Sequence, residues 1–151
     1  MKTFFIIIIS FLAFSCKTEK VLTDLQRAQQ QEKSKSNIQI SAVLGDKIPL
    51  NDFYTISAIE IKANKMLVDV SFSGGCMFHE FKAIGLPISN QAIQPIRQIQ
   101  LSHNSNRDNC EKLMSHTLEI DLKPIALNQQ VGSKTIFILD GWKDQITYIV
   151  E

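Results

Sequence analysis

Four side chains in the middle of the sequence could bind a metal ion or form a covalent bond. Cys76 is followed three positions later by His79, and His103 lies seven positions before Cys110. Two thiolates and two imidazoles suit tetrahedral zinc or a soft copper site. Two oxidised cysteines would instead form a disulfide, which stabilises a domain by restricting its unfolded chain. The sequence predicts a Cys76–Cys110 disulfide, with zinc or copper held by all four side chains as the alternative.

The choice between a disulfide and a metal site depends on the cellular compartment of the protein, because disulfides persist in oxidising compartments. The N-terminus indicates which compartment this is. Lys2 precedes an apolar segment at residues 4–14, in which Ser10 is the polar exception. Its 11 residues would form about 16 Å of helix, roughly half of the hydrocarbon layer that a spanning helix must cross. A short apolar segment after a basic start is typical of a secretory signal peptide. We therefore expect residues 1–15 to be removed and the protein to lie outside the cytoplasm.

The boundary of this segment, from Leu12 to Cys16, resembles the lipobox of bacterial lipoprotein precursors, because the small residue Ser15 directly precedes a cysteine. In that family the cysteine thiol receives a diacylglycerol and becomes the first residue of the mature chain. The resemblance implies lipid attachment at Cys16 and a location in the cell envelope, at the outer or the inner membrane. Two or three acyl chains would give a stable anchor, whereas one gives marginal membrane binding.

A lipidated Cys16 would leave Cys76 and Cys110 as an even pair in an oxidising compartment, which favours the disulfide. The surrounding segment, residues 66–125, resembles a pattern in small uncharacterised lipoproteins of the Bacteroidota. The resemblance is carried by a Ser-Gly-Gly-Cys run that ends at Cys76, by the two histidines, and by Asp108 ahead of Cys110. It joins the two Cys–His segments into one unit but carries no activity to this chain.

Residues 16–37 are predicted to be a lipidated cysteine followed by a flexible tether. Between Lys17 and Asn37 the apolar residues are Val21, Leu22, Leu25 and Ala28, too few to offset the entropy of ordering the segment. Residues 38–151 are predicted to form one domain, which is long enough to bury a hydrophobic core.

Hydrophobic residues in this domain recur mainly with a period of two, which is typical of half-buried strands. The expected strands are 53–62, 65–72, 78–84, 96–103, 117–122, 135–139 and 146–150. About seven short strands predict an all-β fold, a single antiparallel sandwich or barrel. One short helical turn is expected at residues 108–114, where Asp108 and Glu111 have the spacing of a capping box.

The composition excludes several classes of function. The chain has 151 residues, 44% of them hydrophobic, and 16 basic against 15 acidic side chains give a net charge of +1. That charge excludes a nucleic-acid partner, which would require a basic surface. The sequence also has no Gly-x-Ser-x-Gly motif and no second histidine four residues after His79. We therefore expect a non-enzymatic lipoprotein without a cofactor, which binds or scaffolds an unknown protein or small ligand. Envelope metal binding is the alternative.

Overall fold

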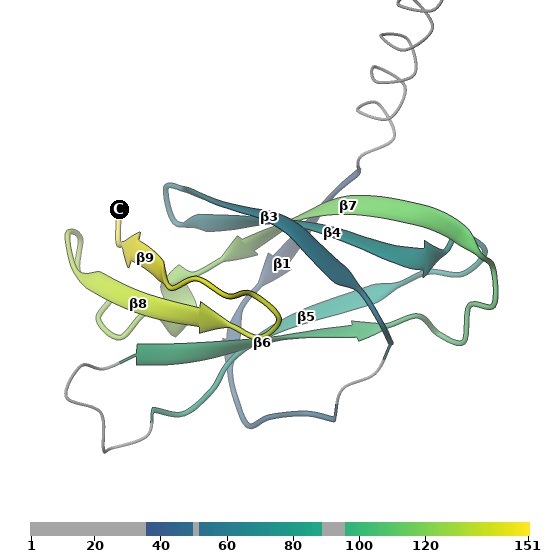
Figure 1. Cartoon of the computed structure of the whole chain (residues 1–151). Coiled ribbons are helices and arrows are strands. Elements are labelled where there is room, and N and C mark those ends of the chain that lie inside the picture. Colours follow the sequence, from purple (N-terminus) through teal and green to yellow (C-terminus); the bar gives the residue numbers. More distant parts are fainter. Residues whose placement is uncertain (1–35, 50–51, 89–95) are drawn as a thin grey trace, which may run out of the picture. The chain divides into compact units, whose positions relative to one another are not determined.

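Two β-sheets pack face to face in the computed structural model of the protein (Figure 1). The structure describes residues 36–49, 52–88 and 96–151. The predicted signal peptide, Cys16 and residues 17–35 of the predicted tether lie outside these ranges. The all-β prediction is confirmed, and the described residues form nine strands where about seven were expected. Within the same ranges, no helix has the length and apolar character needed to cross a membrane.

The first sheet has four strands, two of which form a hairpin around residues 63–64, a turn that the sequence predicts. Its strand order is β1 (Ser36–Ser41), β7 (Lys112–Asp121), β4 (Lys65–Gly74) and β3 (Thr55–Lys62). Strand β3 therefore lies at one edge and β1 at the other. Strand β1 begins at the end of the predicted tether and continues into the predicted domain. Along it Ile38 and Ile40 alternate with Asn37 and Gln39.

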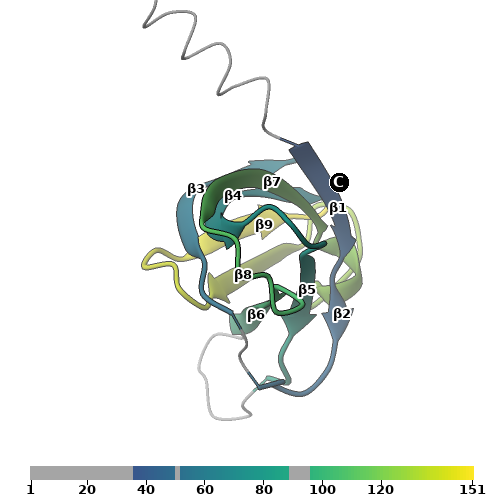
Figure 2. The ribbon, with the colours of Figure 1, turned by 90° about the vertical axis from the view of Figure 1, so that its right-hand side faces the viewer.

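The second sheet has five strands and packs below the first in Figure 2. Its order is β2 (Val43–Leu44), β5 (Glu80–Gly85), β6 (Ile96–Asn104), β8 (Lys134–Leu139) and β9 (Ile146–Ile149). Three neighbouring pairs run parallel, namely β1 with β7, β2 with β5, and β6 with β8. Both sheets thus contain parallel and antiparallel pairs, whereas we expected an antiparallel sandwich or barrel from the sequence. Alternation has the same period in both kinds of pair, so it carries no information about strand direction.

The core lies between the two sheets and is built from the alternating residues of each strand. From β4 the inward-pointing side chains are Met66, Val68, Val70 and Phe72, all at most 3% exposed. Their partners in the core include Leu118 and Ile120 of β7, Ile99 and Leu101 of β6, Phe137 of β8 and Tyr148 of β9. Burying a side chain of this size contributes about 1.5–3 kcal/mol, so alternation of this kind fixes which face of each strand points inward.

The strand directions define two ends of the sandwich. At one end, which we call the disulfide end, residues 75–79 connect β4 to β5 and residues 105–111 connect β6 to β7. This end faces the viewer in Figure 2. The opposite end holds the turn at residues 63–64, the loop 126–133 and Glu151.

The expected helical turn at residues 108–114 is not formed. Residues 108–111 are a loop and β7 begins at Lys112, because the inward alternation of this strand extends back to Met114. The structure instead has a 3-10 turn at Lys123–Ile125, with Pro124 in its first turn, where a proline is tolerated.

Candidate functional site

The two loops of the disulfide end are joined covalently. Cys76 in the first loop is bonded to Cys110 in the second, with 5.9 Å between their Cα atoms. This is the pairing that the sequence predicts. A sulfur in a disulfide cannot act as a thiolate ligand, so the alternative set of Cys76, His79, His103 and Cys110 loses two of its four donors.

A carboxylate joins the same two loops a second time. The Oδ2 atom of Asp108 accepts hydrogen bonds from the backbone N–H groups of Gly75, Cys76 and Met77, at 2.8, 2.9 and 2.8 Å. Its Oδ1 atom accepts from the N–H of Cys110 at 2.9 Å. The bonds from Cys110 and Met77 hold the pKa of Asp108 far below its usual range, since each favours the charged carboxylate.

Two histidines continue this network into the interior. His79 Nε2 lies 3.1 Å from Oδ2 of Asp108, and His79 Nδ1 lies 2.8 Å from Nε2 of His103. Because a carboxylate only accepts, Nε2 of His79 carries its hydrogen, and a single hydrogen lies between Nδ1 of His79 and Nε2 of His103. Burial lowers the pKa of His103, which favours its neutral form. The Nδ1 atom of His103 lies 3.3 Å from the carbonyl oxygen of Asp52.

Aromatic rings enclose the histidine pair. Phe72 stacks on His79 with 4.5 Å between ring centroids, and Phe81 stacks on His103 at 4.4 Å. Tyr54 meets His103 edge-on at 6.0 Å. Exposure is 8% for His79 and 1% for His103. The four residues considered as metal ligands thus form two separate units, an oxidised sulfur pair and a buried imidazole pair.

Gly74 and Gly75 let the first loop approach this network. A Cβ atom at Gly74 would collide with the imidazole of His79. Gly75 has a φ of 110°, in the region that disfavours residues with a side chain. The two glycines therefore bring the loop backbone within hydrogen-bond distance of Asp108.

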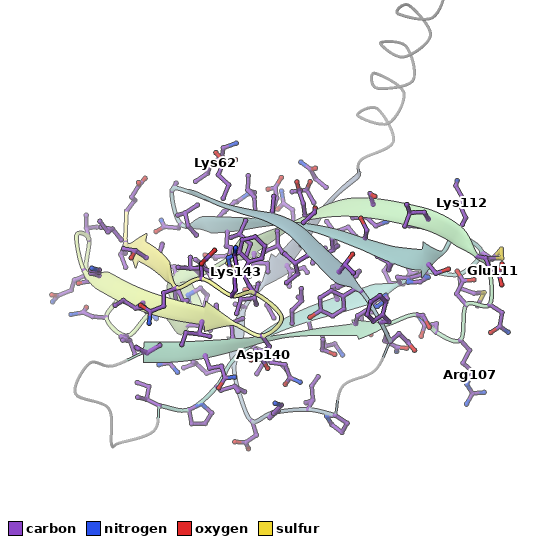
Figure 3. All side chains as sticks on the ribbon, in the orientation of Figure 1. Lys62, Arg107, Glu111, Lys112, Asp140 and Lys143 are labelled. Atoms are coloured by element: carbon purple, nitrogen blue, oxygen red, sulfur yellow. A yellow bond between two sulfur atoms is a disulfide. The ribbon has the colours of Figure 1, made fainter. Side chains whose placement is uncertain are left out.

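Large apolar side chains near the two cysteines in the sequence are exposed. Met77 is 55% exposed, Phe78 is 76% exposed, and Leu113 on the outer face of β7 is 74% exposed. We call these three residues the apolar tip. The charged side chains of Arg107, Glu111 and Lys112 lie at the same end of the molecule (Figure 3).

A hollow of about 550 Å³ lies beside the edge strand β3. Its lining comes from residues 52–56 and from Asp140 and Gly141. Burial, together with the charge of Asp140, raises the pKa of Tyr54 to about 12, and the Tyr54 hydroxyl donates to the Leu101 carbonyl at 2.8 Å. The backbone N–H of Ser105 lowers the pKa of Asp52. The hollow thus combines acidic and aromatic side chains. This combination suits a ligand that carries a cationic or an apolar group.

The cysteines and histidines of this end could be found from the sequence, but the way they are connected could not. Asp108 has the spacing of a helix cap, whereas its carboxylate holds the other loop more than 30 positions away. Phe72 ends the expected strand 65–72, and the structure places its ring against His79. The sequence carried a signal for one of the hydrogen bonds to Asp108, because an Asp side chain commonly accepts the backbone N–H two residues later, here that of Cys110.

Comparison with known proteins shows the fold alone. No protein-family model and no curated protein matches the chain. A NigD-like immunity protein from Bacteroides caccae has a similar structure, with a TM-score of 0.59 and 14% sequence identity over 76% of this chain. A protein of unknown function from Bacteroides vulgatus matches with a TM-score of 0.47 and 13% identity, also over 76% of this chain. The matches span 65% and 56% of those two proteins, less than two thirds of either.

Proposed function

We propose that the protein is a lipoprotein of the cell envelope, anchored through Cys16, and a non-enzymatic binding or scaffold module. One observation carries this proposal. The chain has three cysteines, and the structure pairs Cys76 with Cys110. The remaining cysteine is Cys16, at the end of a segment that resembles a lipobox. A disulfide also fits an oxidising compartment outside the cytoplasm.

The state of the ionisable groups supports binding rather than catalysis. Asp108 has the strongly lowered pKa that is common at active sites, but both of its oxygens already accept hydrogen bonds from the protein. His79 and His103 bond to each other and are covered by aromatic rings. These groups hold the loops together and leave no reactive atom directed at a substrate in this cluster.

The test is lipid labelling of the full-length chain in a bacterial host with lipoprotein processing. We expect the wild type to incorporate radioactive palmitate and to fractionate with membranes, and Cys16→Ser to do neither. The double variant Cys76→Ser with Cys110→Ser is the matched control, because it removes two cysteines but keeps the acceptor. It should remain labelled. Membrane fractionation of Cys16→Ser at the level of the wild type would contradict the proposal.

A further inference from the structure

We propose that the disulfide end docks on the lipid bilayer, with Met77, Phe78 and Leu113 inserted between lipids of the membrane that holds the chain. The proposal rests on the lipid anchor proposed above and names the surface that the anchored domain turns toward the membrane. Four features of the structure support it, namely the exposure of the tip, its rigidity, its position relative to the start of β1, and the charges around it.

The first feature is exposure. Each residue of the apolar tip is more than half exposed. Met77 and Phe78 directly follow Cys76, and Leu113 lies three positions after Cys110, to which Cys76 is bonded. Single exposed apolar residues are ordinary, but a group of large ones at one end of a small domain marks a contact surface.

The second feature is rigidity. Asp108 binds the backbone N–H of Met77, and Asn106 Nδ2 donates to the carbonyl oxygen of Phe78 at 2.6 Å. The disulfide at Cys76 holds the same loop to the β6–β7 connection. The loop therefore cannot fold inward to bury Met77 and Phe78. Little conformational entropy remains to be lost when this loop enters a membrane interface.

The third feature is reach. Ser36 pairs with His116, four positions along β7 from Lys112 at the disulfide end, and β1 runs from there toward the opposite end. The first described residue is therefore about 14 Å from the disulfide end, at about 3.4 Å per strand residue. Twenty positions separate Cys16 from Ser36, and they can span at most about 70 Å. The anchor would thus keep the tip within reach of the bilayer and raise its local concentration there.

The fourth feature is the charge around the tip, together with its shape. Arg107, Glu111 and Lys112 all lie at this end (Figure 3), so its charges are mixed and no strong attraction to anionic lipid is expected. None of the three tip residues lines the hollow beside β3. Exposed apolar side chains on the loop 75–79 and at the start of β7 suit a deformable lipid interface, whereas protein hot spots typically fill pockets.

The experiment places a fluorescent side chain at each end of the full-length lipidated protein. Phe78→Trp and Leu113→Trp report from the tip. Val131→Trp is the matched control, because Val131 is 78% exposed and lies in the loop of the opposite end. Each protein is reconstituted into phosphatidylcholine vesicles with or without brominated acyl chains. Emission of the wild type, which contains only Trp142, is subtracted.

We expect brominated lipid to quench the added emission of Phe78→Trp and Leu113→Trp, with a shift to shorter wavelength, and to leave Val131→Trp unchanged at low and at high salt. Equal quenching at both ends, or quenching at neither, would overturn the proposal. A photocrosslink from position 78 to a protein in cells, with no quenching by lipid, would also overturn it and assign the tip to a protein partner. Palmitate labelling of each variant separates these outcomes from a missing anchor.

Discussion

At each end of the sandwich, one side chain forms hydrogen bonds to several backbone or side-chain groups, but the chemistry of that side chain differs. At the disulfide end, the charged carboxylate of Asp108 collects N–H groups from two loops, and a disulfide joins the same loops. At the opposite end, the neutral amide of Asn64 donates to the carbonyl oxygen of Glu151 at 2.8 Å and accepts from the backbone N–H of Glu151 and the hydroxyl of Tyr148.

The difference shows which end is built to keep its shape. Hydrogen bonds to a charged group are stronger than those to a neutral one, and a covalent link persists when they open. Only the disulfide end combines such reinforcement with a group of exposed apolar side chains around it, within the described residues. The reinforcement therefore serves the presentation of a surface as well as the stability of the fold. Four predictions test this comparison.

The largest expected effect is removal of the disulfide. The variant Cys76→Ser with Cys110→Ser should lower the free energy of unfolding by about 3–4 kcal/mol, because the bond closes a loop with a sequence separation of 34. Urea unfolding of the oxidised wild type and the variant measures the difference. A loss below about 1 kcal/mol would show that the remaining hydrogen bonds hold this end as firmly as the covalent bond does.

The second effect is a change in pH dependence. The hydrogen bonds from Cys110 and Met77 lower the pKa of Asp108, so its contribution to stability is present above the pKa of the unfolded state. It is lost as pH falls below about 4 toward the folded pKa. Asp108→Asn should therefore be less stable at neutral pH and show a shallower loss in acid, measured by urea unfolding between pH 7 and pH 3. An unchanged acid slope would contradict this.

The third effect concerns the opposite end. Asn64→Ala should cost about 1–3 kcal/mol, because it leaves the hydroxyl of the buried Tyr148 without its acceptor. This cost should be the same at pH 7 and pH 4, since neither the amide of Asn64 nor the hydroxyl of Tyr148 changes its charge between these values. Tyr148→Phe and the double variant complete a cycle that isolates this bond. A pH-dependent loss would mean that the contrast between the two ends is wrong.

The smallest effect is expected at the apolar tip. Leu113→Ser should change the free energy of unfolding by no more than about 0.5 kcal/mol, as should Val131→Ser at the opposite end, because both side chains are exposed. Thermal or urea unfolding measures both. A clear loss for Leu113→Ser alone would mean that the tip is part of the packing of the fold and not a surface for docking.

Most strands could be predicted from the sequence because burial on one face imposes alternation. In β4, Met66 to Phe72 alternate as a strand between two layers requires, and the structure buries that face. The disulfide could be predicted by counting, since a cysteine set aside for lipid leaves one pair. The strands follow from burial on one face, and the disulfide follows from the even number of remaining cysteines. Neither prediction requires knowledge of distant contacts.

The remaining features depend on contacts between segments far apart in the chain. Ile38 and Ile40 have the alternation of a strand, but the polar residues around them masked it. The parallel direction of β1 cannot be predicted from its residue types, because they alternate in the same way in parallel and antiparallel strands. The carboxylate of Asp108 was expected to accept backbone N–H groups near its own position, and its main partners belong to a loop over 30 residues away. Sequence patterns report residue types well and distant partners poorly.

The parallel pairing of β1 with β7 also orders the assembly of the protein. Asn37 pairs with Thr117 and Ile40 with Ile120, so the first strand of the described residues is completed only when a segment 80 positions later has been synthesised. Contacts with such large sequence separation form slowly, because a long loop must close first. The first sheet therefore gains this edge late in folding.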